Sequence, residues 1–361
     1  MLVHDYLLVL RGAERTFAAM TDAWPDAPIV TLLYDEEGTE GRFAGRTVIT
    51  SPLGRLGLRQ HNFRTFLPVY PGAVSRLDLR DFDCVVSSSS AFVHGVRPAP
   101  GARHVCYCHS PFRYAWHEQA RALAEVPLVL RPALGLALRR HRSFDWRAAR
   151  RVDRYVANGV LTRERIARFW GRDAEIVYPP VDVERFSLGE PGDHVLFVGE
   201  LVAHKRPELA IEAAAAAGRH IKVVGEGPEL ARLRDRYGPA AEFLGRVGDE
   251  QLARVYAEAA ALVVPNVEEF GIAAVEAQAA GRPVIAVDAG GARETVIPGH
   301  TGLLIAQGNA AALAQALRED LTRFDPQAIR RHAQRFSRSA FQARMREMVE
   351  LTCGSPPGAG A

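Results

Sequence analysis

Short apolar runs rich in β-branched residues alternate along the chain with longer segments whose apolar residues recur at helical spacing. The apolar runs, each predicted to be a strand, are 29–34, 83–89, 104–109, 154–158, 175–179, 194–200, 221–227, 242–247, 261–265 and 283–287. Between the later runs lie ELAIEAAAAAG, PELARLRDRYG and DEQLARVYAEAA, and the first two end on glycine, a common helix stop. Repetition of strand, glycine and helix predicts an α/β protein whose parallel sheets are covered by helices on both faces.

One stretch interrupts this alternation. The segment YPPVDVERFSLGEPGDH (178–194) is rich in proline, glycine and charge, and a new series of strands and helices begins after it. We therefore expect two doubly wound domains, residues 1–183 and 184–329, with a cleft between them and ligands at the carboxyl ends of the strands. The last nine residues, 353–361, are small and polar enough to predict a disordered tail.

Composition narrows the class of protein. With 48% apolar and 24% charged residues the chain has the make-up of a folded soluble protein, and a net charge of +3 is too small to predict nucleic-acid binding. No leader peptide is evident and no run of about 18 uncharged apolar residues occurs, so we expect a cytoplasmic location. The four cysteines lack metal-ligand spacing, so we expect buried reduced thiols, with Cys106 and Cys108 on one face of a strand, and no metal.

The segment 127–151 differs from the other predicted helices, because apolar residues come first and a run of arginines follows. One interpretation is a basic amphipathic segment in peripheral contact with anionic lipid at the inner membrane surface, or with a lipid-linked substrate. The other is an ordinary surface helix whose arginine stems cover apolar area.

Two strand ends in the second half of the chain favour an anionic ligand. In VGEGPEL, Gly225 and Gly227 precede a helix and would let a nucleotide approach the backbone. The stretch does not match the full dinucleotide fingerprint, which disfavours a dehydrogenase. In FVGELVAHKRPELAI, Lys205 and Arg206 precede another helix and could stabilise charge on a departing diphosphate, although a solvated basic pair has the same pattern.

The stretch NVEEFGIAAVE is the strongest signal. We expect Glu268 in a loop, a helix beginning near Gly271, and Glu276 about 7–8 Å further along that helix. Two carboxylates so placed could serve two ends of an elongated ligand, such as a sugar and a ribose. In the first half, HVCYCHSPFRYAWHE ends a strand in His109, which could contact a ligand or be purely structural. The aromatic and basic residues that follow it, suited to carbohydrate or phosphate contact, are Arg113, Tyr114 and Trp116.

On these motifs, together with GGARETVIPGHTGLL, the chain resembles the family 4 retaining glycosyltransferases, which have the GT-B fold of two Rossmann-like domains facing a central cleft. The stretches HDYLLVLRGAERTF, SSSSAFVHGV, CYCHSPFRYAW and YPPVDVERF are similar to the bacterial O-antigen mannosyltransferases. This resemblance implies that a hexose, with mannose from GDP-mannose favoured, is transferred with retention to a glycan or lipid-linked acceptor by a front-face route that needs no metal.

The resemblance also implies roles for single residues. Glu268 would contact the donor sugar, Glu276 the ribose, Lys205 the diphosphate and His109 the transferred sugar. The other implied donor-binding residues are Gly12, Arg206, Gly225, Gly227, Val247, Phe270, Gly271 and Ile272. The C-terminal helix, 330–352, would pack back on the first domain.

One departure from the family pattern leaves an alternative open. Glu200 stands where most relatives have an arginine that pairs with the diphosphate, and a carboxylate there would repel it. The alternative is a weakly active or inactive relative that binds a nucleotide sugar and acts as an assembly partner. An epimerase of the same fold is disfavoured, because the two-glutamate segment and HSPFRYAW do not resemble that family.

Overall fold

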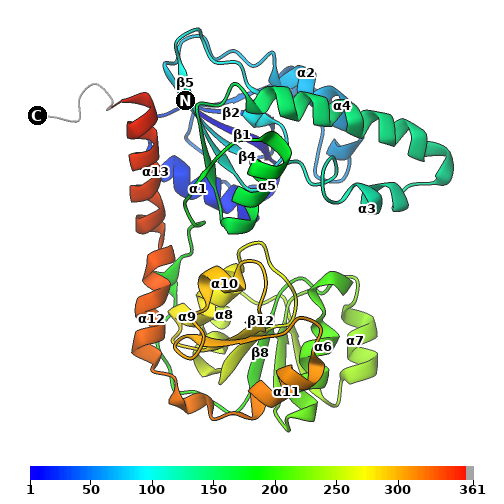
Figure 1. The fold of residues 1–361 in the computed structure, drawn as a ribbon, viewed down its shortest axis with the longest axis vertical. Coiled ribbons are helices and arrows are strands. Elements are labelled where there is room, and N and C mark those ends of the chain that lie inside the picture. Colours follow the sequence, from blue (N-terminus) through cyan, green and yellow to red (C-terminus); the bar gives the residue numbers. More distant parts are fainter. Residues whose placement is uncertain (355–361) are drawn as a thin grey trace, which may run out of the picture. The chain divides into compact units, whose positions relative to one another are not determined.

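The computed structural model describes residues 1–354, which form two compact units (Figure 1). The first unit contains Met1–Tyr178 and the chain from Gln342 onward, and the second contains Pro179–Phe341. Each unit is built around one parallel sheet with helices packed on it, and the predicted fold class, two doubly wound Rossmann-like α/β domains, is confirmed.

The sheet of the first unit has the order β3-β2-β1-β4-β5-β6-β7, and all of its pairs are parallel. Its strands are β1 (Leu2–Leu7), β2 (Ile29–Tyr34), β3 (Val48–Thr50), β4 (Cys84–Ser89), β5 (Arg103–Cys108), β6 (Arg154–Ala157) and β7 (Glu175–Ile176). Its helices are α1 (Gly12–Ala23), α2 (Tyr70–Val74), α3 (Gln119–Ala124), α4 (Arg131–Ala149) and α5 (Val160–Trp170), with α13 (Arg338–Cys353) at the end of the chain. The order reverses between β1 and β4, which makes the carboxyl ends of these two strands the topological switch point.

The second unit repeats the arrangement with the order β10-β9-β8-β11-β12-β13. Its strands are β8 (Val195–Val198), β9 (Ile221–Val224), β10 (Ala241–Gly245), β11 (Ala261–Val264), β12 (Val284–Val287) and β13 (Gly302–Ile305). Its helices are α6 (Pro207–Ala216), α7 (Leu230–Tyr237), α8 (Asp249–Glu258), α9 (Ile272–Ala279), α10 (Ala292–Thr295), α11 (Ala310–Arg318) and α12 (Pro326–Ala333). Here the switch point lies between β8 and β11.

The predicted single helix over 330–352 is instead two helices. The first, α12, belongs to the second unit, and the chain breaks at Ser337 before α13 begins. Within the first unit α13 packs on α1, since the Gln342 side chain donates to the carbonyl of Ala19 at 2.9 Å. The prediction of a disordered tail from residue 353 is wrong at Cys353, because that residue is the last of α13. Residues 355–361 of that prediction lie outside the described part of the chain.

The cysteines divide into two kinds. Cys106 and Cys108 are buried free thiols on β5, as predicted. The expectation of reduced thiols is wrong for Cys84 and Cys353, which form a disulfide between the start of β4 and the end of α13. The two residues are 269 positions apart, so only the course of α13 along the first unit brings them together.

Candidate functional site

Lys205 and Glu268 meet at the switch point of the second unit. Lys205 lies in the loop after β8 and Glu268 in the loop after β11, and these strands are neighbours in the sheet. The Lys205 Nζ atom is 2.6 Å from both carboxylate oxygens of Glu268, and both side chains are about a quarter exposed. The buried Asn266 donates to the same carboxylate at 2.8 Å. A cation and a carboxylate at one strand edge can bind an anionic group beside a hydroxyl-bearing one.

Arg206 is the second cation of this loop. It caps α6 in the left-handed conformation, with φ of 53°, a strained state for a residue other than glycine. Its half-buried side chain makes no hydrogen bond or ion pair within residues 1–354, whereas Lys205 is engaged by Glu268. Glu200, the departure from the family pattern, lies two residues after β8 and is exposed.

Gly225 and Gly227 allow two strand-end loops to touch. Both have positive φ, 137° and 158°, and a Cβ at Gly225 would lie 1.9 Å from the carbonyl oxygen of Gly199. A Cβ at Gly227 would lie 2.3 Å from the carbonyl oxygen of Leu201, whose amide donates to Glu226 at 2.8 Å. These glycines are therefore required by the protein's own backbone, apart from any nucleotide.

The loop that carries Glu268 is fixed by a similar close approach. The amide of Gly291 donates to the carbonyl of Glu268 at 2.9 Å, and a Cβ at Gly291 would lie 2.2 Å from the carbonyl oxygen of Phe270. Gly271 then begins α9 with φ of 90°, where the sequence placed the start of that helix. Phe270 is buried against Phe336, at 5.5 Å between ring centroids, so its side chain belongs to the core. The Gly-Gly pair belongs to the motif GGARETVIPGHTGLL, but its role in holding this loop is not evident from sequence alone.

Glu276 lies on α9, and its carboxylate contacts Arg185 and Tyr256, two residues that were not among the predicted site residues. One carboxylate oxygen lies 3.2 Å from the guanidinium of Arg185, and the other accepts from the Tyr256 hydroxyl at 2.9 Å. Arg185 also pairs with Asp249 at 2.9 Å. An open depression of about 460 Å³ adjoins this cluster and is lined by Arg185, Asp249, Glu250, Ala253 and Arg254. Two of the implied donor-binding residues lie nearby in sequence: Val247 is half-buried just before α8, and Ile272 is 36% exposed at the start of α9.

The first unit carries His109 at the end of β5. Its Nε2 atom lies 2.8 Å from the Ser88 hydroxyl, which is also 3.1 Å from Nδ1 of His4 on β1. The His4 ring stacks on Phe17 at 4.6 Å between ring centroids. Gly12 begins α1 in this region, and a Cβ there would meet no atom within 4 Å, so the protein's own packing does not require glycine.

Burial lowers the pKa of several imidazoles in the first unit, because the protonated ring loses its hydration there. The pKa falls to about 3 for His4 and His94, and to about 4 for His104, His109 and His141. These rings are neutral at physiological pH. His109 is therefore suited to hydrogen bonding rather than to charge stabilisation.

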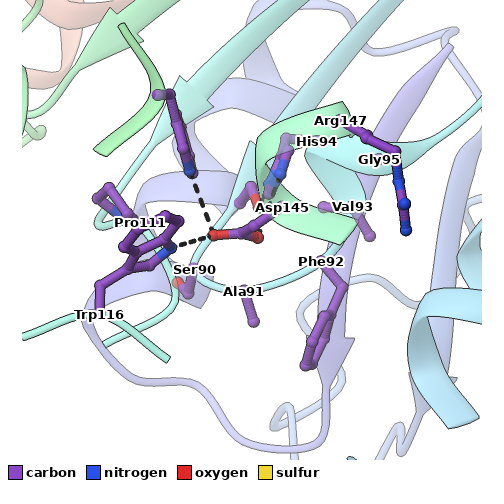
Figure 2. A network of polar contacts seen from close by, with 12 residues as sticks. Ser90, Ala91, Phe92, Val93, His94, Gly95, Pro111, Trp116, Asp145 and Arg147 are labelled. Carbon is purple, nitrogen blue, oxygen red and sulfur yellow. Dashed lines mark hydrogen bonds and ion pairs between the residues drawn. The ribbon is translucent and has the colours of Figure 1, made fainter. Parts of the chain in front are cut away.

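The predicted aromatic contacts after His109 mostly serve the interior. The Trp116 indole donates to the buried Asp145 at 2.6 Å, and its ring stacks on Phe169 at 4.8 Å (Figure 2). Tyr114 packs edge-on against the buried Phe112, whereas Arg113 is exposed. Burial raises the pKa of Asp145 to about 7. The Trp116 indole N–H already donates within the protein, so it cannot also donate to a carbohydrate, and the predicted contact surface is smaller by that group.

Comparison with known proteins follows the division into two units. Residues 10–185 match the family described as Glycosyltransferase Family 4, and residues 182–337 match Glycosyl transferases group 1. D-inositol 3-phosphate glycosyltransferase of Streptomyces coelicolor is 33% identical over 237 residues, which cover 51% of this chain and 52% of that protein. The enzyme of the same name from Geodermatophilus obscurus is 34% identical over 252 residues, covering 57% and 56%. The chain thus spans about half the length of the curated relatives it matches.

Solved structures resemble the chain over nearly its whole length. The Anabaena protein HepE in complex with UDP superposes with a TM-score of 0.71 at 17% identity, covering 97% of this chain and 99% of that one. Sucrose-phosphate synthase from Thermosynechococcus elongatus gives a TM-score of 0.70 at 18% identity, with the same coverage of 97% and 99%. At these identities the likeness establishes the fold.

Proposed function

Because the chain belongs to the family 4 and group 1 glycosyltransferases, with two Rossmann-like domains of the GT-B type, we propose that it transfers a hexose from a nucleotide sugar to a hydroxyl group of an acceptor. The observation that carries this proposal is the pairing of Lys205 with Glu268 at the switch point of the second unit. An ammonium for the diphosphate and a carboxylate for sugar hydroxyls stand there side by side, with Arg206 as a second cation.

In this proposal the donor nucleotide binds to the second unit. Lys205 and Arg206 stabilise the diphosphate as negative charge builds on it, and Glu268 accepts hydrogen bonds from hydroxyls of the sugar. Glu276 holds the ribose hydroxyls, which compete with Arg185 and Tyr256 for its two oxygens. His109 of the first unit donates a hydrogen bond to the transferred sugar.

We propose transfer with retention by a front-face route. The bond between the anomeric carbon and the diphosphate oxygen breaks, and the acceptor oxygen bonds to that carbon on the same face. The departing diphosphate oxygen takes the acceptor's proton, so neither a protein base nor a metal ion takes part. The protein's contribution is positioning and charge stabilisation.

The proposed donor is GDP-mannose, supported by the resemblance of CYCHSPFRYAW and YPPVDVERF to mannosyltransferases. The relatives named above are inositol-phosphate glycosyltransferases, and HepE was solved with UDP, so uridine nucleotides are the main competitors. The proposed acceptor is a glycan or a lipid-linked glycoconjugate, and the proposed location is the cytoplasm.

Thermal shift and donor hydrolysis across GDP-, UDP-, ADP- and dTDP-sugars, with and without EDTA, test these statements. One donor should raise the melting temperature and be hydrolysed slowly, equally well with EDTA, and Lys205→Met should abolish both effects. Lys222→Met, the same change on β9, is the control and should leave both intact. If a donor binds but is not hydrolysed, the inactive assembly partner suggested by Glu200 replaces the transferase proposal, and if no donor binds, the transferase proposal fails. An NMR assignment of the product's anomeric configuration tests retention.

We also propose that the segment 127–151 contacts an anionic membrane surface. It forms the short 3₁₀ turn Leu128–Leu130 and α4, which extends past the strands of the first unit in Figure 1. Leu128 is 73% exposed, Val129 84% and Leu130 53%, a cluster of apolar side chains that no residue of 1–354 covers. Arginines exposed along the same segment are Arg139, Arg140, Arg147, Arg150 and Arg151. None of the helices in residues 1–354 is both long enough and apolar enough to cross a bilayer.

Co-sedimentation with vesicles tests this contact. The protein should bind vesicles that contain phosphatidylglycerol and not vesicles of phosphatidylcholine alone, and Val129→Asn should weaken binding. Leu351→Asn, at a position 63% exposed on α13, is the matched control and should have no effect. Equal binding by the two variants would assign the segment to an ordinary surface helix.

A further inference from the structure

Three consecutive serines of β4 each place their hydroxyl against a histidine. Ser87 Oγ lies 2.7 Å from Nε2 of His104, and Ser89 Oγ lies 3.4 Å from Nδ1 of His94. Ser88, between them in sequence, points to the other face of the sheet, where its hydroxyl contacts two imidazoles. All three serines are buried.

The Ser88 hydroxyl has one proton to share between two ring nitrogens. Its oxygen lies 3.1 Å from Nδ1 of His4 and 2.8 Å from Nε2 of His109, so it can donate to one and must accept from the other. Both imidazoles are neutral, because burial lowers the pKa of His4 to about 3 and that of His109 to about 4. Each ring therefore carries a single N–H, and the two tautomers are linked through Ser88.

The two hydrogen-bond distances give the direction of this chain of bonds. Hydroxyl donors make shorter bonds than ring N–H donors, which matches Ser88 donating over 2.8 Å and His4 donating over 3.1 Å.

We propose that Ser88, oriented by His4, is a positioning residue that holds His109 as the tautomer with its proton on Nδ1. His109 is half-buried, and its Nδ1 makes no hydrogen bond to the described part of the chain, so that N–H is available to an oxygen of a ligand. The proposal rests on the proposed function for the identity of the ligand, a sugar hydroxyl. It makes His109 a fixed donor whose other nitrogen is already occupied, in keeping with transfer that uses no protein base.

The tautomer is measured directly in the ligand-free protein. Long-range ¹H–¹⁵N correlation spectra of the ¹⁵N-labelled full chain, with the His109 signals identified by their loss in His109→Gln, should show a protonated Nδ1 and a bare Nε2. A protonated Nε2 would overturn the proposal without any variant of Ser88. In Ser88→Ala the donor to Nε2 is gone, so the Nε2–H tautomer should become populated, and Ser88→Thr should restore the wild-type pattern. Ser88→Ala spectra identical to wild type would also overturn it.

Kinetics provide a readout that depends on the proposed function. Ser88→Ala should lower kcat for donor hydrolysis about tenfold, the effect of losing about one neutral hydrogen bond, with little change in KM. Ser87→Ala removes the same hydroxyl one residue away, from His104, and should leave both the His109 tautomer and kcat unchanged. If the wild type hydrolyses no donor while the spectra match, the proposed function fails and the tautomer assignment stands. If hydrolysis occurs and the two serine variants behave alike, the inference fails alone.

Discussion

Removing the charge of Glu268 should strengthen binding of a nucleoside diphosphate while it abolishes sugar transfer. In the ligand-free protein the Lys205 ammonium is held at 2.6 Å by both oxygens of that carboxylate. A diphosphate that binds Lys205 must therefore compete with Glu268, and a neutral Glu268→Gln side chain competes far less. The expectation is counter-intuitive, because a residue of the proposed active site is lost and an affinity rises.

The size of the effect follows from the ion-pair geometry. At 2.6 Å, Coulomb attraction is about 1.6 kcal/mol in bulk water and about 6 kcal/mol at an effective dielectric constant of 20. Both side chains are about a quarter exposed, so water screens much of this attraction. The ammonium has three donors and can keep one on the carboxylate while it binds phosphate. We therefore expect a net gain of about 1 kcal/mol, or about fivefold in Kd.

Isothermal titration of wild type and Glu268→Gln with the nucleoside diphosphate of the best donor measures this gain. The gain should shrink as salt is raised from low to physiological ionic strength, since screening weakens both competitors. Glu242→Gln, which removes one charge at the amino end of β10, is the control and should leave Kd unchanged. An unchanged or weaker affinity in Glu268→Gln would mean that Lys205 is not the cation that meets the diphosphate.

Four further outcomes follow from other parts of the protein. The free energy of unfolding should rise between about pH 4 and 6.5, because the five imidazoles with lowered pKa stay neutral in the fold and take up protons once unfolded. Asp145, with its pKa raised to about 7, holds a proton that the unfolded chain releases above about pH 4, so Asp145→Asn should steepen that rise by up to about 1.4 kcal/mol per pH unit in urea titrations. Gly227→Ala should cost about 2–4 kcal/mol in the same titrations, because its Cβ would overlap the carbonyl of Leu201 at a positive φ. Non-reducing peptide mapping should find Cys84 linked to Cys353, and Cys353→Ser should lower the free energy of unfolding by about 2–5 kcal/mol.

Control substitutions accompany the glycine and disulfide predictions, and the pH predictions have a result that would contradict them. Gly248→Ala, at a position with negative φ and open space around its Cβ, should be nearly neutral beside Gly227→Ala. Cys106→Ser should leave the disulfide peptide intact, because Cys106 is a free thiol. A flat stability profile from pH 4 to 6.5, or an Asp145→Asn profile parallel to that of the wild type, would contradict the pKa argument.

The sequence predicted those parts of the fold in which local pattern and tertiary position agree. Central strands such as β11 and β12 were predicted correctly because every residue in them is apolar, and such runs are buried in a sheet core. Three strands were missed. The edge strands β3 and β13 are partly exposed. The central strand β1 is buried, but His4 and Asp5 interrupt its apolar run. The disulfide could not be predicted, because its cysteines are 269 residues apart and neither has a local signature.

The proposed site divides in the same way. Lys205 and Glu268 could be found because each follows a strand at a predictable place, and the sheet order makes them neighbours. Asn266 and Tyr256 were missed, since their roles depend on which carboxylate they reach and not on their own motifs. Arg185 lies in the predicted boundary segment and within YPPVDVERF, but neither pattern indicates that its guanidinium reaches Glu276.

The two switch points are built from different chemistry, and this difference supports a division of labour. In the second unit, charged side chains meet over loops whose glycines permit direct contact between main chains, as at Gly225 and Gly291. In the first unit, a neutral chain of hydroxyl and imidazole groups ends at His109. The buried Asp5 there is surrounded by four backbone N–H donors, from residues 90–93, and so presents no bare charge. The second unit thus offers cations for an anionic ligand, whereas the first unit offers neutral hydrogen-bonding groups.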